Sequence, residues 1–109
     1  MPTTIQIVRM PDGKLQPATG PRNKVKPGES VIFTAGPGAE GLIIEFAGPS
    51  PFGDSPANRA FGYGVSKPVV KPFHETPGSS NVYVYVCKGA ADAAPTNPGD
   101  GGEVEVVRG

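Results

Sequence analysis

The sequence predicts an all-β fold: a single Greek-key β-sandwich domain, spanning residues 1–109, with about seven short strands. Three observations lead to this prediction. Short runs rich in Val, Ile, Phe and Tyr recur along the chain, and no run shows helical periodicity. The 16 glycines and 14 prolines fall between these runs instead of within them. Short strands separated by turn signals are typical of two-sheet sandwiches.

The first half of the chain contains four expected strands. Thr4–Met10 alternates apolar and polar residues and predicts the first strand, whereas Lys14–Asn23 is polar and predicts irregular structure. Lys24–Ala35 predicts two strands, or one bent strand, broken at Pro27-Gly28. Leu42–Phe46 is almost entirely apolar, as in a strand that is covered on both faces.

Two long Gly/Pro-rich connections divide the second half. The first, Ala47–Pro68, has room for a short helical turn at Pro56–Ala60, and Val69-Val70 after it could form a short strand. Val82–Cys87 is the most strand-like segment, and its uncharged, aggregation-prone composition suits an interior strand. After the second connection, Lys88–Gly102, the alternating segment Glu103–Arg108 predicts the last strand.

Charge and composition exclude several classes of partner. Ten basic and ten acidic residues balance without forming a charged block, which argues against nucleic acid and anionic membranes as partners. No apolar stretch approaches the ~18 residues of a membrane helix. The amino terminus lacks a signal-peptide pattern, so we expect a cytoplasmic protein if the chain is complete, or a periplasmic or secreted one if a signal was trimmed.

Several motifs together resemble the cupredoxin family of plastocyanin-like and azurin-like domains. Pro77-Gly78 leads into an aromatic strand that ends at Cys87, and a final strand begins near Gly101-Gly102-Glu103 after a long loop. Upstream, Val25–Phe33 (VKPGESVIF) is similar to the family's strand, Pro-Gly-Glu turn and Val-x-Phe strand. The resemblance covers most of the chain and implies a cupredoxin-like sandwich.

The family's copper site uses two His, one Cys and an axial Met, a donor set that selects copper. Cys87 is the only position that matches a family ligand. One imidazole should lie near Gly41 or Leu42 and the other around Ala90, and the loop Lys88–Gly102 contains no Met. The only histidine, His74, precedes the Pro-Gly turn, where the family supplies no ligand. The resemblance therefore implies a domain without metal or other cofactor.

Other chemical motifs have simpler interpretations. Cys87 suits a small buried apolar position, although a reactive thiol or an intermolecular disulfide are alternatives. A catalytic pair of Cys87 and His74 would lack an orienting third residue. Residues 36–41 spell G-x-G-x-x-G, but a strand follows where a dinucleotide site needs a helix, so we expect a hairpin loop.

A possible interaction surface comprises Phe52, Phe61, Tyr63 and His74, because binding residues concentrate on long loops held by a rigid scaffold. The alternative is that the three aromatic residues pack against the sandwich and that His74 is a solvated turn residue. The expected function is a non-enzymatic, metal-free binding or assembly module that recognises another protein through its loops. The alternatives are a copper electron-transfer protein with an atypical or partner-completed site, and a small hydrolase or redox enzyme built on Cys87.

Overall fold

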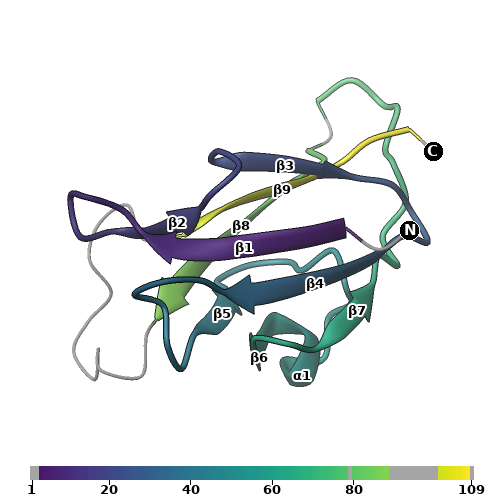
Figure 1. Cartoon of the computed structure of the whole chain (residues 1–109). Coiled ribbons are helices and arrows are strands. Elements are labelled where there is room, and N and C mark those ends of the chain that lie inside the picture. The colour runs from purple at the N-terminus through teal and green to yellow at the C-terminus, as the bar shows by residue number, and fades with distance from the viewer. Residues whose placement is uncertain (1–2, 79, 89–100, 109) are drawn as a thin grey trace.

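The computed structural model describes residues 3–78, 80–88 and 101–108, which form two open mixed β-sheets packed in a sandwich-like arrangement (Figure 1). Of these residues, only a single helical turn, α1 (Pro56–Arg59), is not strand, turn or loop. The strands are β1 (Thr3–Arg9), β2 (Leu15–Pro17), β3 (Arg22–Val25), β4 (Ser30–Ala35), β5 (Ile43–Phe46), β6 (Ala60–Gly62), β7 (Ser66–Pro68), β8 (Val82–Lys88) and β9 (Gly102–Val106).

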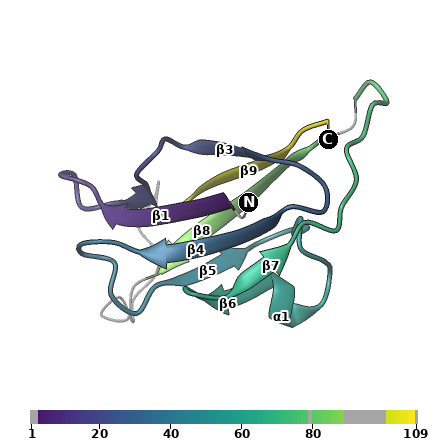
Figure 2. The same ribbon diagram turned by 45° about the vertical axis from the view of Figure 1, so that its right-hand side comes forward.

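The four-stranded sheet has the order β2-β1-β4-β7, and the five-stranded sheet has the order β3-β9-β8-β5-β6. Two neighbouring pairs, β1 with β4 and β3 with β9, are parallel, whereas the other pairs are antiparallel. Figure 2 shows the two sheets facing each other across the core. Because β8 lies between β9 and β5, the prediction that the VYVYVC segment is an interior strand is confirmed.

The core is formed by the side chains that each strand turns toward the opposite sheet. In β1 these are Ile5 and Ile7, and in β4 they are Val31 and Phe33, in agreement with their period-two spacing. A cluster of aromatic rings fills the wider part of the core, with ring centroids 5.1 Å apart for the closest pair, Phe33 and Tyr85. Edge-to-face packing of this kind adds to the stabilisation from burial.

All the expected strands except the one at Val69-Val70 are present, and the described residues form nine strands instead of about seven. The segment 14–23, expected to be irregular, contains β2 and the start of β3. The Gly/Pro-rich connection 47–68 contains β6 and β7 as well as the anticipated helical turn, whereas Val69-Val70, which could have formed a short strand, is not in a strand. The three additional strands, β2, β6 and β7, have three residues each, so pairing with a neighbour defines them more than their own composition does.

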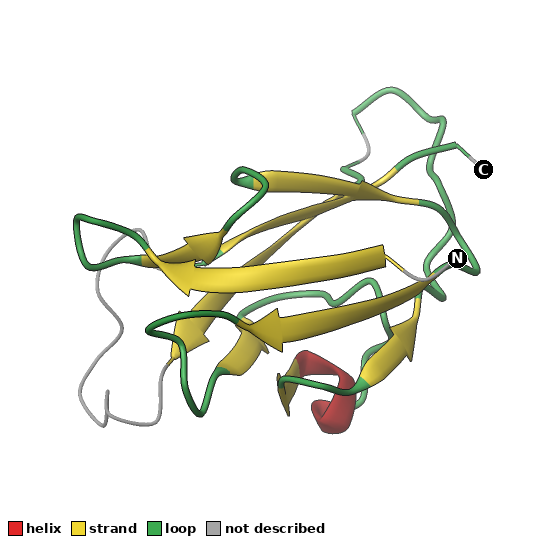
Figure 3. Ribbon diagram, viewed as in Figure 1, coloured by secondary structure: helices red, strands yellow, loops and turns green. Residues whose placement is uncertain are grey.

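Two further expectations need correction. Strand β5 is buried on one face only: Ile43 is 45% exposed, because it points away from the four-stranded sheet. The loop over residues 36–41 is not a hairpin, since it joins β4 in one sheet to β5 in the other. Figure 3 shows this loop in green between the two yellow strands.

Among the described residues, no helix is long and apolar enough to cross a membrane. The connection 89–100, which contains the position expected for a second imidazole, lies outside the described residues.

Candidate functional site

Cys87 lies next to the carboxyl end of β8, in the core. Its side chain is 0% exposed and shares the inward face of the strand with Tyr83 and Tyr85, as the period-two alternation of a strand requires. Val84, between them, points outward and is exposed. The position opposite Cys87 in the register is the buried Ile44 of β5. The thiol is therefore enclosed within the core.

The structure shows where another copper-ligand position of the cupredoxin pattern lies relative to Cys87. Leu42, at the position expected for the first imidazole, is buried in the same core, two residues before Ile44. His74 is at the opposite end of β8, where its backbone is bonded to Asn81. Within residues 3–78, 80–88 and 101–108, no three His, Cys, Asp or Glu side chains are grouped so that they could hold a metal ion.

The four residues of the predicted interaction surface do not form one patch. Phe52 is buried in the core, and Phe61 packs partly against it, 5.8 Å from the Phe52 ring between centroids. Both aromatic rings are therefore part of the core packing. Tyr63 is 50% exposed and lies beside Leu42, to whose carbonyl its N–H donates. It is therefore near the Cys87 end of β8, whereas His74 is near the other end.

A groove of about 440 Å³ opens beside His74, at the end of the sandwich where β8 begins. Three separate segments form its walls: the connection after β5, the connection between β7 and β8, and the start of β8. Figures 1 and 2 show the green β7–β8 connection beside the carboxyl end of β9. We call this feature the His74 groove; its lining residues are Pro49, Lys71, Pro72, His74, Ser80, Val82 and Tyr83.

Hydrogen bonds hold the walls of the His74 groove in place. The Asn81 side chain accepts from the His74 N–H at 2.8 Å and donates to the His74 carbonyl at 3.0 Å, so it replaces a strand partner. The backbone N–H groups of Val70 and Lys71 donate to the Pro51 carbonyl, at 2.9 and 3.2 Å. The connection between β7 and β8 is thus fastened to the connection after β5 and is closed on itself next to the start of β8, although its described residues have no regular secondary structure.

The polar groups of the groove include a cation beside a phenol. The Lys71 ammonium donates to the Asp54 carboxylate at 2.8 Å, and this hydrogen bond raises the pKa of Lys71. Burial raises the pKa of the Tyr83 phenol, against the smaller opposing effect of the Lys71 charge. Lys71 therefore remains an ammonium ion at neutral pH, and Tyr83 remains a neutral hydroxyl.

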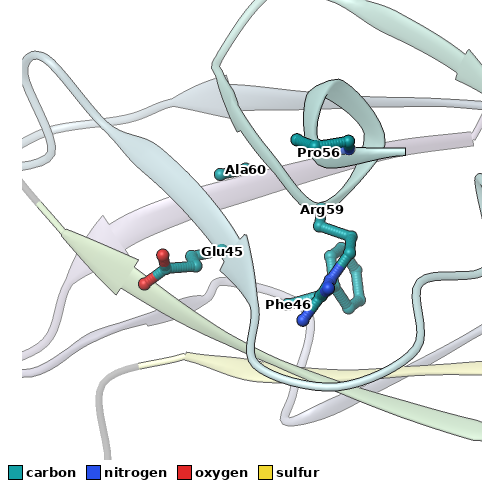
Figure 4. Close-up of a pocket in the computed structure, with 5 residues that line it drawn as sticks. All are labelled: Glu45, Phe46, Pro56, Arg59 and Ala60. Carbon is teal, nitrogen blue, oxygen red and sulfur yellow. The ribbon is translucent and has the colours of Figure 1, made fainter. Parts of the chain in front are cut away.

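Two smaller pockets flank α1 and have mixed charge. Figure 4 shows the first, of about 190 Å³, with Glu45 set apart from Arg59, which overlaps the Phe46 ring in this view. Both charges have neighbours: Glu45 pairs with Lys88 at 2.9 Å, and Arg59 donates to the Ala47 carbonyl at 3.2 Å. The second, of about 220 Å³, is lined by Gly48, Pro49, Asp54 and Arg59.

Sequence reasoning identified His74 as a surface residue but missed Lys71, Asn81 and Tyr83 as parts of a site. Lys71 and its partner Asp54 are 17 positions apart and share no motif. The one available signal was the length of the Gly/Pro-rich connections, which predicted that functional residues would lie there. No protein-family model matches this chain. Comparison with curated proteins finds no significant match either.

Proposed function

We propose that this chain is a metal-free, cupredoxin-like Greek-key module that binds another protein through the loops at its His74 end. The resemblance of the motifs around Cys87 supports the family assignment. The core position of Leu42 supports the absence of metal, because an apolar side chain takes the place of a ligand. No catalytic step is part of the proposal.

The observation that carries the binding role is the construction of the His74 groove. Loops that bind partners need a rigid scaffold, and here the walls are fastened by the Asn81 amide and the Pro51 carbonyl. Its volume of about 440 Å³ lies within the ~300–1,000 Å³ usual for binding pockets. A pre-formed groove also lowers the entropy cost of binding.

The test blocks the groove without changing the core. Ser80→Trp places a large ring at the groove wall, because Ser80 is exposed and lines the groove. Ala18→Trp is the matched control, since it adds the same ring at an exposed turn beside β2, outside the groove. Each full-length variant serves as bait for affinity capture from the native source, followed by quantitative mass spectrometry. Retained melting temperatures establish that both variants fold.

We expect at least one protein to be captured by the unmodified chain and by Ala18→Trp, and to be depleted tenfold or more with Ser80→Trp. Tyr63→Ala provides a second comparison at the other end of β8, where the proposal expects no loss. Equal capture by all the variants would contradict a binding role for the groove. Loss with Tyr63→Ala alone would move the binding surface to the Cys87 end.

A further inference from the structure

The walls of the His74 groove combine hydrogen-bond donors with apolar surface. Lys71, His74, Ser80 and Tyr83 each have at least one N–H or O–H, and Pro49, Pro72 and Val82 are apolar. None of these seven lining residues is a carboxylate. By contrast, the two pockets that flank α1 contain Glu45 or Asp54 in their linings. The His74 groove is therefore the one of these three that favours an anion.

Lys71 retains donor capacity toward the groove. An ammonium group has three N–H donors, and among the described residues the hydrogen bond to Asp54 uses one of them. Asp54 does not line the groove, so it orients the ammonium group from outside. The phenol of Tyr83 is close enough to Lys71 for the charge to act on its pKa. An incoming carboxylate could thus accept from the ammonium and the phenol together.

The apolar residues of the groove wall favour a ligand that carries an apolar group next to its anionic group. Pro49 and Pro72 are exposed, and Val82 and the Tyr83 ring lie at the start of β8. Burying an apolar group between them contributes roughly 25 cal/mol per Å² of surface removed from water. A bare inorganic anion would leave these apolar side chains in contact with water. The groove therefore suits a ligand that carries a carboxylate beside an apolar or aromatic group.

We infer that the His74 groove binds an acidic peptide segment, with an Asp or Glu carboxylate on Lys71 and an adjacent apolar side chain between the two prolines. This inference rests on the proposed protein-binding function and specifies the chemistry of the partner. A peptide is favoured because three separate segments form the groove, most of its lining residues are exposed, and an extended chain can lie across it.

The test compares two probes that differ only in charge. Acetyl-Phe-Asp-amide and acetyl-Phe-Asn-amide are titrated into the ¹⁵N-labelled full chain, and amide shifts are followed by NMR. We expect the Asp peptide to bind at least fivefold more tightly and to shift the amides of Lys71, His74 and Val82. Its affinity should fall with added salt, since charge attraction is screened. Sodium acetate, which lacks the apolar group, should bind at least fivefold more weakly than the Asp peptide.

Substitutions at the ion pair test the role assigned to Lys71. Lys71→Met removes the charge and keeps an apolar stem, so the Asp peptide should lose its advantage over the Asn peptide. Lys24→Met, on the exposed part of β3, is the control and should change neither affinity. Asp54→Asn removes a carboxylate that competes for the ammonium, so it should tighten binding of the Asp peptide at least twofold. A merely structural Lys71–Asp54 pair would predict weaker binding in this variant.

Equal affinity for the two peptides, an unchanged preference in Lys71→Met, or acetate binding as tightly as the Asp peptide would overturn the inference. The capture experiment with Ser80→Trp separates this outcome from failure of the proposed function. If Ser80→Trp abolishes capture while the Asp peptide shows no preference, the groove binds a partner of different chemistry. If the peptide binds as expected while capture is unaffected, the protein-binding function is the part that fails.

Discussion

The Tyr85 hydroxyl is buried without a hydrogen-bond partner among the described residues, so removing it should stabilise the protein. Tyr85 is 1% exposed, and its ring packs against Phe33 and Phe46. A β-carbon built on Gly102 would lie 2.7 Å from the Tyr85 hydroxyl, which leaves no room for a larger residue there. Tyr85→Phe keeps the ring and its packing and removes only the oxygen.

An unsatisfied buried hydroxyl costs ~1–3 kcal/mol. Loss of the oxygen's van der Waals contacts offsets part of this gain, so we expect a net increase of about 1 kcal/mol in the free energy of unfolding at pH 7. For a domain of this length, this corresponds to a rise of about 4–8 °C in melting temperature. Urea denaturation, followed by the backbone circular dichroism signal, measures this change in the free energy of unfolding. Tyr83→Phe is the control without an expected gain, because its phenol borders the His74 groove.

The pH dependence gives a second measure of the same group. Burial raises the pKa of Tyr85 far above its ordinary value of ~10. The folded-state pKa exceeds the unfolded one, so above pH ~10 the phenol ionises more readily in the unfolded chain. The free energy of unfolding is therefore at its full value below pH ~10 and falls as pH rises above it, by at most about 1.4 kcal/mol per pH unit. The variant should lose less stability than the unmodified chain above pH 10. A Tyr85→Phe variant destabilised by 1 kcal/mol or more at pH 7 would show that the hydroxyl is bonded, and would refute the reasoning.

Three further predictions follow from the core and its turns. Native Cys87 should react with a thiol reagent at least a hundredfold more slowly than in urea, because its side chain is fully buried; fast native labelling would favour a reactive cysteine. Gly101→Ala should destabilise the fold by roughly 3 kcal/mol or more, since Gly101 has a φ of +123° and an added β-carbon would lie 2.1 Å from the Tyr85 carbonyl oxygen. Gly28→Ala, at a φ of +85° with open space around the added β-carbon, should cost only about 1–2 kcal/mol. Similar unfolding free energies for the two variants would be inconsistent with this geometry. The melting temperature should be the same with and without a chelator, because a metal stabilises only a native state that has a site for it, and a large decrease would revive the copper-protein alternative.

Strand β8 shows how much of the fold local sequence could predict. Its β-branched and aromatic residues predicted its extent to within one residue, and period-two alternation puts Tyr83, Tyr85 and Cys87 on one face, which the structure turns inward. Its lack of charge indicated an interior position, which the sheet order confirms. These properties depend on neighbours one or two positions away, so they can be read from the chain directly.

Features set by distant partners could not be predicted in the same way. The three-residue strand β7 has two polar residues and a proline, and it is a strand because Ser66 and Lys67 pair with β4. Strand β5 looked covered on both faces because its composition is apolar, but no element packs over Ile43 among the described residues. The His74 groove depends on Lys71 and on an Asn81 side chain that takes the place of a backbone partner. Nothing in the local pattern of either residue distinguishes it from an ordinary loop residue.

The inward face of β8 becomes more accessible toward its start. Exposure falls from 8% at Tyr83 to 1% at Tyr85 and 0% at Cys87. A ligand that approaches this row of side chains from solvent therefore meets the Tyr83 phenol and, beside it, the Lys71 ammonium, while the thiol lies behind two aromatic residues. Chemistry at Cys87 would require the described core to open, whereas binding at Tyr83 requires only that water leave an existing groove. This difference in cost favours the proposed binding at the His74 end over thiol chemistry.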